Sequence, residues 1–136
     1  MADLHLSTVG WLVMGVVGGA ALLIYSKSFG RARRKVLANG LLIVALLYVL
    51  FALRIGPSIW LLYELLGVGI FGLVAWLGVN RGTSWLAVGW VLHPLWDAGL
   101  HFQGPGSSFA PEWYVVACIS FDLLVGVVIQ LKRREL

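Results

Sequence analysis

Charged residues are scarce in this sequence. Ten lysines and arginines and six acidic residues make up 12% of its 136 residues, whereas a soluble domain carries roughly 25% charged residues. Hydrophobic residues account for 60% of the chain, and the mean hydropathy is +0.93. The scarcity of charge excludes an ordinary soluble domain and predicts an integral membrane protein whose immediate partner is the lipid bilayer.

Cysteine is almost absent, and polar linkers are short. The single Cys118 can form no intrachain disulfide, and its apolar surroundings favour a small core residue. No stretch is long enough to join two domains, so we expect one domain over residues 1–136.

The net charge of +4 does not indicate a nucleic-acid partner, because the basic residues cluster between apolar runs.

Five apolar runs fill most of the chain, each of roughly the 20 residues that cross a bilayer as a helix. They cover about residues 9–25, 36–53, 58–79, 84–102 and 112–131. No basic residue precedes the first run, so we expect it to remain as a helix and not to be cleaved as a signal peptide. The fold class predicted is an all-α bundle of five transmembrane helices.

The basic residues predict the orientation of this bundle. With the N-terminus outside and the C-terminus cytoplasmic, every basic residue except Arg54 falls in a cytoplasmic segment, as the positive-inside rule requires. These cytoplasmic residues are Lys27, Arg31, Arg33, Arg34, Lys35, Arg81, Lys132, Arg133 and Arg134. Small residues predict two close helix seams, one at Gly15, Gly18 and Gly19 and one at Gly67, Gly69 and Gly72.

Ionisable residues inside or beside the apolar runs are the strongest indication of a site. They are Arg54, Glu64, His93, Asp97, His101, Glu112 and Asp122. A charge in hydrocarbon costs at least about 2.5 kcal/mol, so such residues usually face the protein interior or a cavity. In the predicted orientation all of them lie at mid-depth or nearer the outer face, which predicts an outward-facing polar pocket.

The fourth run carries the centre of this pocket. His93, Asp97 and His101 are spaced by four residues, so they lie on one stripe of a helix. Glu64 and Asp122, on the third and fifth runs, are the partners expected beside it. These five residues are the candidate catalytic residues, and Pro94 predicts a kink with a freed carbonyl beside His93.

A divalent metal is one candidate cofactor for this stripe. Asp97 can share an ion with His93 or with His101, because residues four apart lie on one helix face. The two histidines are separated by about 12 Å along the helix axis, so they cannot both bind the same ion. A third ligand would come from Asp122, Glu64 or His5.

Acid–base chemistry on a lipophilic, isoprenoid-like or other lipid substrate is the second candidate. Trp90 and Trp96 flank the stripe and could stabilise a cation through their rings, and Arg54 and Tyr63 are further candidates for substrate contact. A structural network is the third reading, with Asp97 paired to Arg54 or a histidine. The protein would then be a non-catalytic subunit of a membrane complex, or a homo-oligomer that forms a structural assembly or a channel.

The pattern Trp90-x-x-His93-x-x-Trp96-Asp97, followed by Pro111-x-Trp113-Tyr114 and Phe121-Asp122, resembles a family of small bacterial integral membrane proteins of unknown function. The resemblance covers the chain from about Tyr63 onward. It implies a place in the bacterial cytoplasmic (inner) membrane and a functional half formed by the last three helices. It implies no particular activity.

Overall fold

The computed structural model describes residues 2–102 and 104–136, with side chains from residue 7 onward. The described chain is all-α. Its long helices are α1 (Ala2–Lys27), α2 (Arg33–Ile55), α3 (Ser58–Asn80), α4 (Thr83–Trp96) and α5 (Glu112–Leu131). Three short elements complete it: the 3₁₀ turns η1 (Gly30–Ala32) and η3 (Pro105–Ser108), and the π-helix η2 (Asp97–Phe102).

Within the described residues, four of the helices are long and apolar enough to cross a membrane. They correspond to Ser7–Lys27, Gly30–Ile55, Ser58–Asn80 and Glu112–Leu131, and they confirm the prediction of a membrane protein. The predicted run over residues 84–102 does not form one long α-helix, because α4 ends at Trp96 after 14 residues. Helical backbone nevertheless continues from α4 directly into η2 and ends at Phe102.

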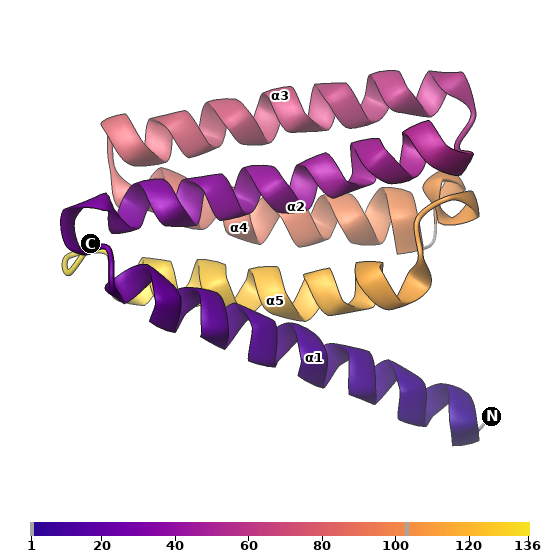
Figure 1. Ribbon diagram of the computed structural model, residues 1–136, viewed down its shortest axis with the longest axis horizontal. Helices are drawn as coiled ribbons and strands as arrows, with labels where there is room; N and C mark the ends of the chain where they lie inside the picture. Colours follow the sequence, from indigo (N-terminus) through magenta and orange to yellow (C-terminus); the bar gives the residue numbers. More distant parts are fainter. Residues whose placement is uncertain (1, 103) are drawn as a thin grey trace.

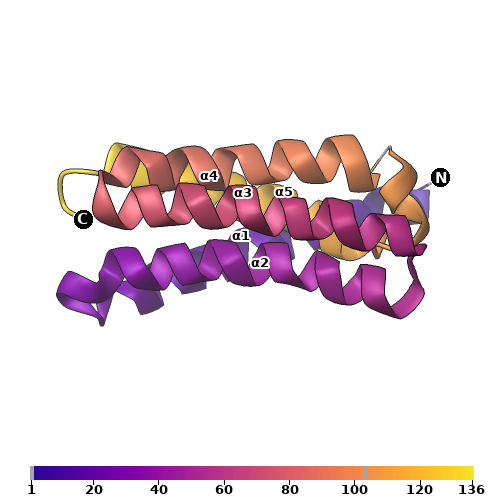
Figure 2. The same cartoon turned by 90° about the horizontal axis from the view of Figure 1, so that it is seen from above.

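Successive helices run back and forth along the long axis of the molecule (Figure 1). In that view α3 lies at one edge, α2 and α4 come next, α5 follows, and α1 lies at the other edge beside α5. Figure 2 places α2 and α4 in different layers. Because α4 contacts α2, α3 and α5, polar side chains on its inner face are enclosed by protein.

The α1–α2 and α3–α4 connections and the C-terminus share one end of the bundle, while the N-terminus lies at the other (Figure 1). The first of these ends carries all the basic residues except Arg54, and we call it the basic end. The chain is tied together there, because Arg34 Nε donates to the Leu136 carbonyl at 2.9 Å and Arg33 Nε donates to Ser26 Oγ at 3.1 Å.

Glycine sets the distance between α1 and α5, as the sequence predicts. A Cβ on Gly15 would collide with the Ala117 carbonyl oxygen and with Ser120 Oγ, so the two backbones are in direct contact. Ser120 Oγ reinforces the seam by donating to the Leu12 carbonyl at 2.8 Å. The third-helix glycines do not form one seam, since Gly67 packs against Trp96 whereas a Cβ added at Gly69 would meet no atom within 4 Å.

Candidate functional site

The five candidate catalytic residues come together in the interior. Their exposed fractions are 2% for Glu64, 1% for His93, 0% for Asp97, 1% for His101 and 0% for Asp122. They come from α3, α4, η2 and α5, and we call them the buried polar cluster. Groups of this kind are rarely enclosed so fully without partners, so the contacts among them decide what the cluster can do.

One half of the cluster joins His93 to two aspartates. His93 Nδ1 lies 2.7 Å from Asp122 Oδ2, a hydrogen bond between α4 and α5. The same nitrogen lies 3.4 Å from Asp97 Oδ2 on the following turn. One ligand atom from each of these three residues lies within 4.8 Å of the others. We call this group the His–Asp–Asp centre.

The other half joins His101 to Glu64. His101 Nε2 and Glu64 Oε1 are hydrogen-bonded at 2.8 Å between η2 and α3. The second ring nitrogen, Nδ1, lies 4.0 Å from Asp97 Oδ1. Asp97 therefore stands between the two histidines, with one carboxylate oxygen toward each, as expected from their spacing. His101 is not a member of the three-residue group that could hold an ion.

Pro94 accounts for the local backbone. Proline has no N–H to give to the preceding turn, so the regular α-helical ladder is interrupted beside His93. The N–H of Asp97 bonds to the carbonyls of both His93 and Pro94, and the helix then widens into the π-helix η2. The expected distortion thus takes the form of a π-helix, a feature found frequently at functional sites. It carries Asp97 and His101 on its inner face, where both are buried.

Aromatic rings enclose the cluster, and sequence reasoning missed Tyr48 and Phe71 among them. Tyr48 of α2 stacks on His101 with ring centroids 4.1 Å apart and an interplanar angle of 22°. Phe71 of α3 meets His93 edge-on at 4.8 Å. The Tyr48 hydroxyl is buried and has no hydrogen-bond partner among the described residues. In the sequence, the only indication of a role for Tyr48 is that a tyrosine occurs within an otherwise apolar run.

The predicted outward-facing pocket is closed in the structure. Trp60 and Phe109 pack against each other with centroids 5.4 Å apart, and both rings lie over His101, at 6.4 and 5.8 Å. Phe109 follows η3, a turn between η2 and α5 that packs against η2. The connection after residue 103 therefore covers the cluster, because the Phe109 side chain packs inward against His101.

The residues predicted to contact a substrate are placed differently from one another. Trp96 lies beside the cluster, with Phe71 at 6.0 Å. Trp90 is fully buried in the core against Phe121, and Arg54 and Tyr63 are exposed. The structure therefore brings only Trp96 of these four residues to the cluster. His5 lies outside the residues whose side chains are described.

Negative charge exceeds positive charge in the cluster. It contains three carboxyl groups and two imidazoles, and among the described residues no lysine or arginine forms an ion pair with any of them. The pairing of Asp97 with Arg54 is not formed. Even with both imidazoles protonated, one negative charge remains without a counter-charge. Either a carboxyl group keeps its proton or a cation binds, because an isolated buried charge is strongly unfavourable.

We expect replacement of Glu64 by alanine to destabilise the protein. The substitution leaves His101 Nε2 buried without its partner at 2.8 Å, and an unsatisfied buried polar group lowers the free energy of unfolding by about 1–3 kcal/mol. Thermal unfolding of the purified variant measures the change. Glu112→Ala is the control, since Glu112 is exposed at the start of α5, and equal effects of the two substitutions would contradict the role given to Glu64.

Together these features define a small helical membrane protein with a buried His/Asp cluster. The chain belongs to a family of unknown function, DUF6010, which matches residues 10–134. The match extends well beyond the second half of the chain, where the resemblance was expected. No curated protein and no solved structure matches the chain.

Proposed function

We propose that this protein binds a divalent metal ion within the membrane, at the His–Asp–Asp centre. The observation that carries the proposal is the convergence of one nitrogen and two carboxylate oxygens within 4.8 Å of one another, from residues that are at most 1% exposed. Imidazole and carboxylate together suit zinc and other divalent transition metals. A bound cation would also offset the excess negative charge of the cluster.

The distances in the centre are close to those that an ion requires. Tetrahedral ligands about 2.1 Å from zinc lie roughly 3.4 Å apart. The separation of His93 Nδ1 and Asp97 Oδ2 is already 3.4 Å, and that of His93 Nδ1 and Asp122 Oδ2 is 2.7 Å. An opening of less than about 1 Å between α4 and α5 would bring the His93–Asp122 separation to about 3.4 Å as well, and all three ligand atoms lie within 4.8 Å of one another. His101, which is hydrogen-bonded to Glu64, faces the second oxygen of Asp97 and would orient that carboxylate without binding the ion itself.

A metal-dependent reaction on a lipophilic substrate is the activity that the surroundings favour. A groove of about 430 Å³ lies on the surface between α3 and α4, and Phe71 and Trp96 form part of its lining. Phe71 also touches His93, at 4.8 Å between centroids, so one aromatic wall separates this groove from the centre. A lipid that entered the groove sideways from the bilayer would be separated from His93 by these side chains. The metal could polarise the substrate or activate water.

Metal titration of the purified protein tests the binding proposal. After treatment with a chelator, we expect the full-length protein in detergent to bind about one Zn²⁺ per chain by calorimetry, with affinity that rises with pH because bound ligands must be deprotonated. Mg²⁺, which prefers an all-oxygen octahedral shell, should compete poorly. Absence of stoichiometric Zn²⁺ binding would refute the proposal.

We further propose that all five helical segments cross the bacterial inner membrane with the basic end in the cytoplasm. The basic residues gathered at one end support this orientation. A fluorescent protein fused to the C-terminus should fluoresce, and alkaline phosphatase fused there should be inactive. The reverse pair of results would invert the orientation, and the cluster would then lie toward the cytoplasmic side.

A further inference from the structure

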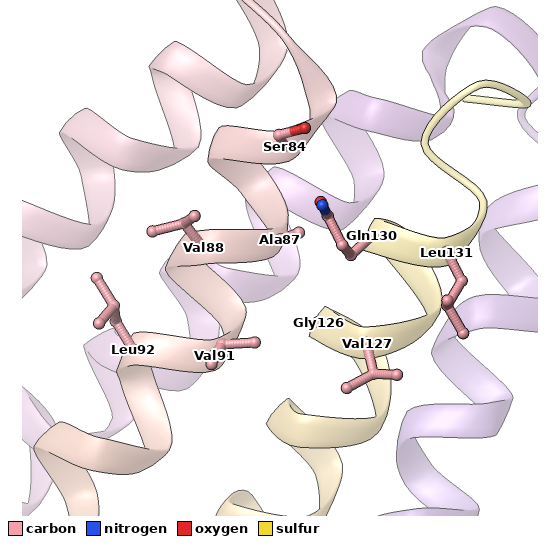
Figure 3. Close-up of a pocket in the computed structure, with 9 residues that line it drawn as sticks. All are labelled: Ser84, Ala87, Val88, Val91, Leu92, Gly126, Val127, Gln130 and Leu131. Carbon is pink, nitrogen blue, oxygen red and sulfur yellow. The ribbon is translucent and has the colours of Figure 1, made fainter.

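A second surface feature lies between α4 and α5, on the other side of Leu92 from the α3–α4 groove. It is an open groove of about 440 Å³, with Ala87 and Gly126 at its floor and Val88, Val91 and Val127 along its sides. Figure 3 shows the valines extending from both helices while the small residues leave the space between them free. Its surface is almost wholly apolar, so along its length it suits a hydrocarbon chain.

The length of this α4–α5 groove matches one leaflet of a bilayer. It extends from Ser84, at the basic end, to Leu92. Eight residues of helix correspond to about 12 Å, and half of a hydrocarbon core of about 30 Å is about 15 Å. A transmembrane helix of a partner would need an apolar surface through both leaflets. The groove instead stops beside His93, so a single acyl chain fits it better.

Positive charge brackets the mouth of the groove. Arg81 lies two residues before α4 and Lys132 directly follows α5, and both are exposed. Lys132 Nζ also lies 3.9 Å from Glu135 Oε2, in an exposed ion pair with which a lipid phosphate would compete. Ser84 and Gln130 add polar side chains at the same level, as Figure 3 shows. The N-terminus of α4 also faces this end, and its cap at Gly82 supplies no side-chain hydrogen bond, so its first N–H groups favour an anion.

We propose that the α4–α5 groove binds one anionic phospholipid, with an acyl chain between Val88 and Val127 and the phosphate between Arg81 and Lys132. The apolar length and the cationic mouth match the two parts of that molecule. This site is separate from the His–Asp–Asp centre. The inference therefore does not depend on metal binding.

Native mass spectrometry of the full-length protein tests the proposal, in detergent supplied with phosphatidylglycerol or with phosphatidylcholine of the same acyl chains. We expect one phosphatidylglycerol per chain to be retained in preference to phosphatidylcholine. Arg81→Ala and Lys132→Ala should each weaken retention about five-fold. Val88→Trp combined with Val127→Trp fills the groove and should abolish it. Both positions are partly exposed, at 43% and 49%, so the larger rings can be accommodated without disturbing the core.

Matched control variants distinguish lipid binding in this groove from non-specific attraction of anionic lipid to the basic end. Leu66→Trp combined with Leu73→Trp adds the same rings to exposed positions of α3, and Lys35→Ala removes an exposed charge at the basic end that lines the surface between α2 and α3 instead. Both should retain the lipid as the wild type does. Equal retention of the two lipids, loss in the control variants, or a second protein chain in place of the lipid would overturn the proposal.

Discussion

Replacing Asp97 by asparagine is expected to lower Zn²⁺ affinity at least about 100-fold while the protein still folds. Asp97 contributes an oxygen to the His–Asp–Asp centre and is 0% exposed. The amide has nearly the same shape but is a weak ligand, so the centre loses one of its three donors. Because the cluster holds three carboxyl groups and only two imidazoles, replacing one carboxyl group by a neutral amide should leave thermal stability without metal unchanged or slightly higher. Calorimetry and thermal unfolding, each with and without Zn²⁺, measure both effects.

Two further variants make this result specific. Asp122→Asn should reproduce the loss of affinity, because Asp122 supplies the donor from α5. Glu112→Gln removes an exposed carboxylate at the start of the same helix and should bind Zn²⁺ as the wild type does. If Asp97→Asn bound Zn²⁺ normally, the centre would not be the metal site. If neither the wild type nor the variants bound metal, the non-catalytic subunit would become the better account.

Replacing Gly15 by alanine is expected to lower the melting temperature by about 5 °C or more. The added methyl group would collide with the Ala117 carbonyl oxygen and with Ser120 Oγ, so α1 must move away from α5. Forcing an extra carbon into a close-packed contact lowers the free energy of unfolding by about 1–3 kcal/mol. Thermal unfolding in detergent, followed by loss of helical signal or by aggregation, measures the shift.

Gly10→Ala is the matched control on the same helix. A Cβ at Gly10 has no neighbour within 4 Å, while the change in helix propensity and in unfolded-chain entropy is the same as at Gly15. We expect its melting temperature to equal that of the wild type or to rise by a few degrees, because alanine favours the helix by up to about 1 kcal/mol. Similar shifts for the two variants would show that Gly15 does not set the α1–α5 contact.

The positions of the helices could be predicted because hydropathy and length decide them. The predicted runs over residues 58–79 and 112–131 correspond to α3 (Ser58–Asn80) and α5 (Glu112–Leu131) almost residue for residue. The five cluster residues could also be found, since an ionisable side chain in an apolar helix needs a protein partner. His93 and Asp97 share a face through spacing alone.

The closure of the site could not be predicted from the same rules. Tyr48 comes from α2, far from the stripe in sequence, and its stacking on His101 depends on how α2 and η2 pack. The same holds for Phe109, which lies in the turn-rich segment between η2 and α5 and reaches His101 only through tertiary packing. Pro94 indicated a distortion, but whether it became a kink or a π-helix depended on the neighbouring helices.

A crystal structure of the protein grown with Zn²⁺, with anomalous diffraction collected at the zinc edge, tests the central claim most directly. The account predicts one anomalous peak per chain between α4 and α5, with His93, Asp97 and Asp122 each about 2.0–2.2 Å from it. A map with no peak at this position, in which His93 and Asp122 remain hydrogen-bonded at the 2.7 Å seen here, would contradict the account.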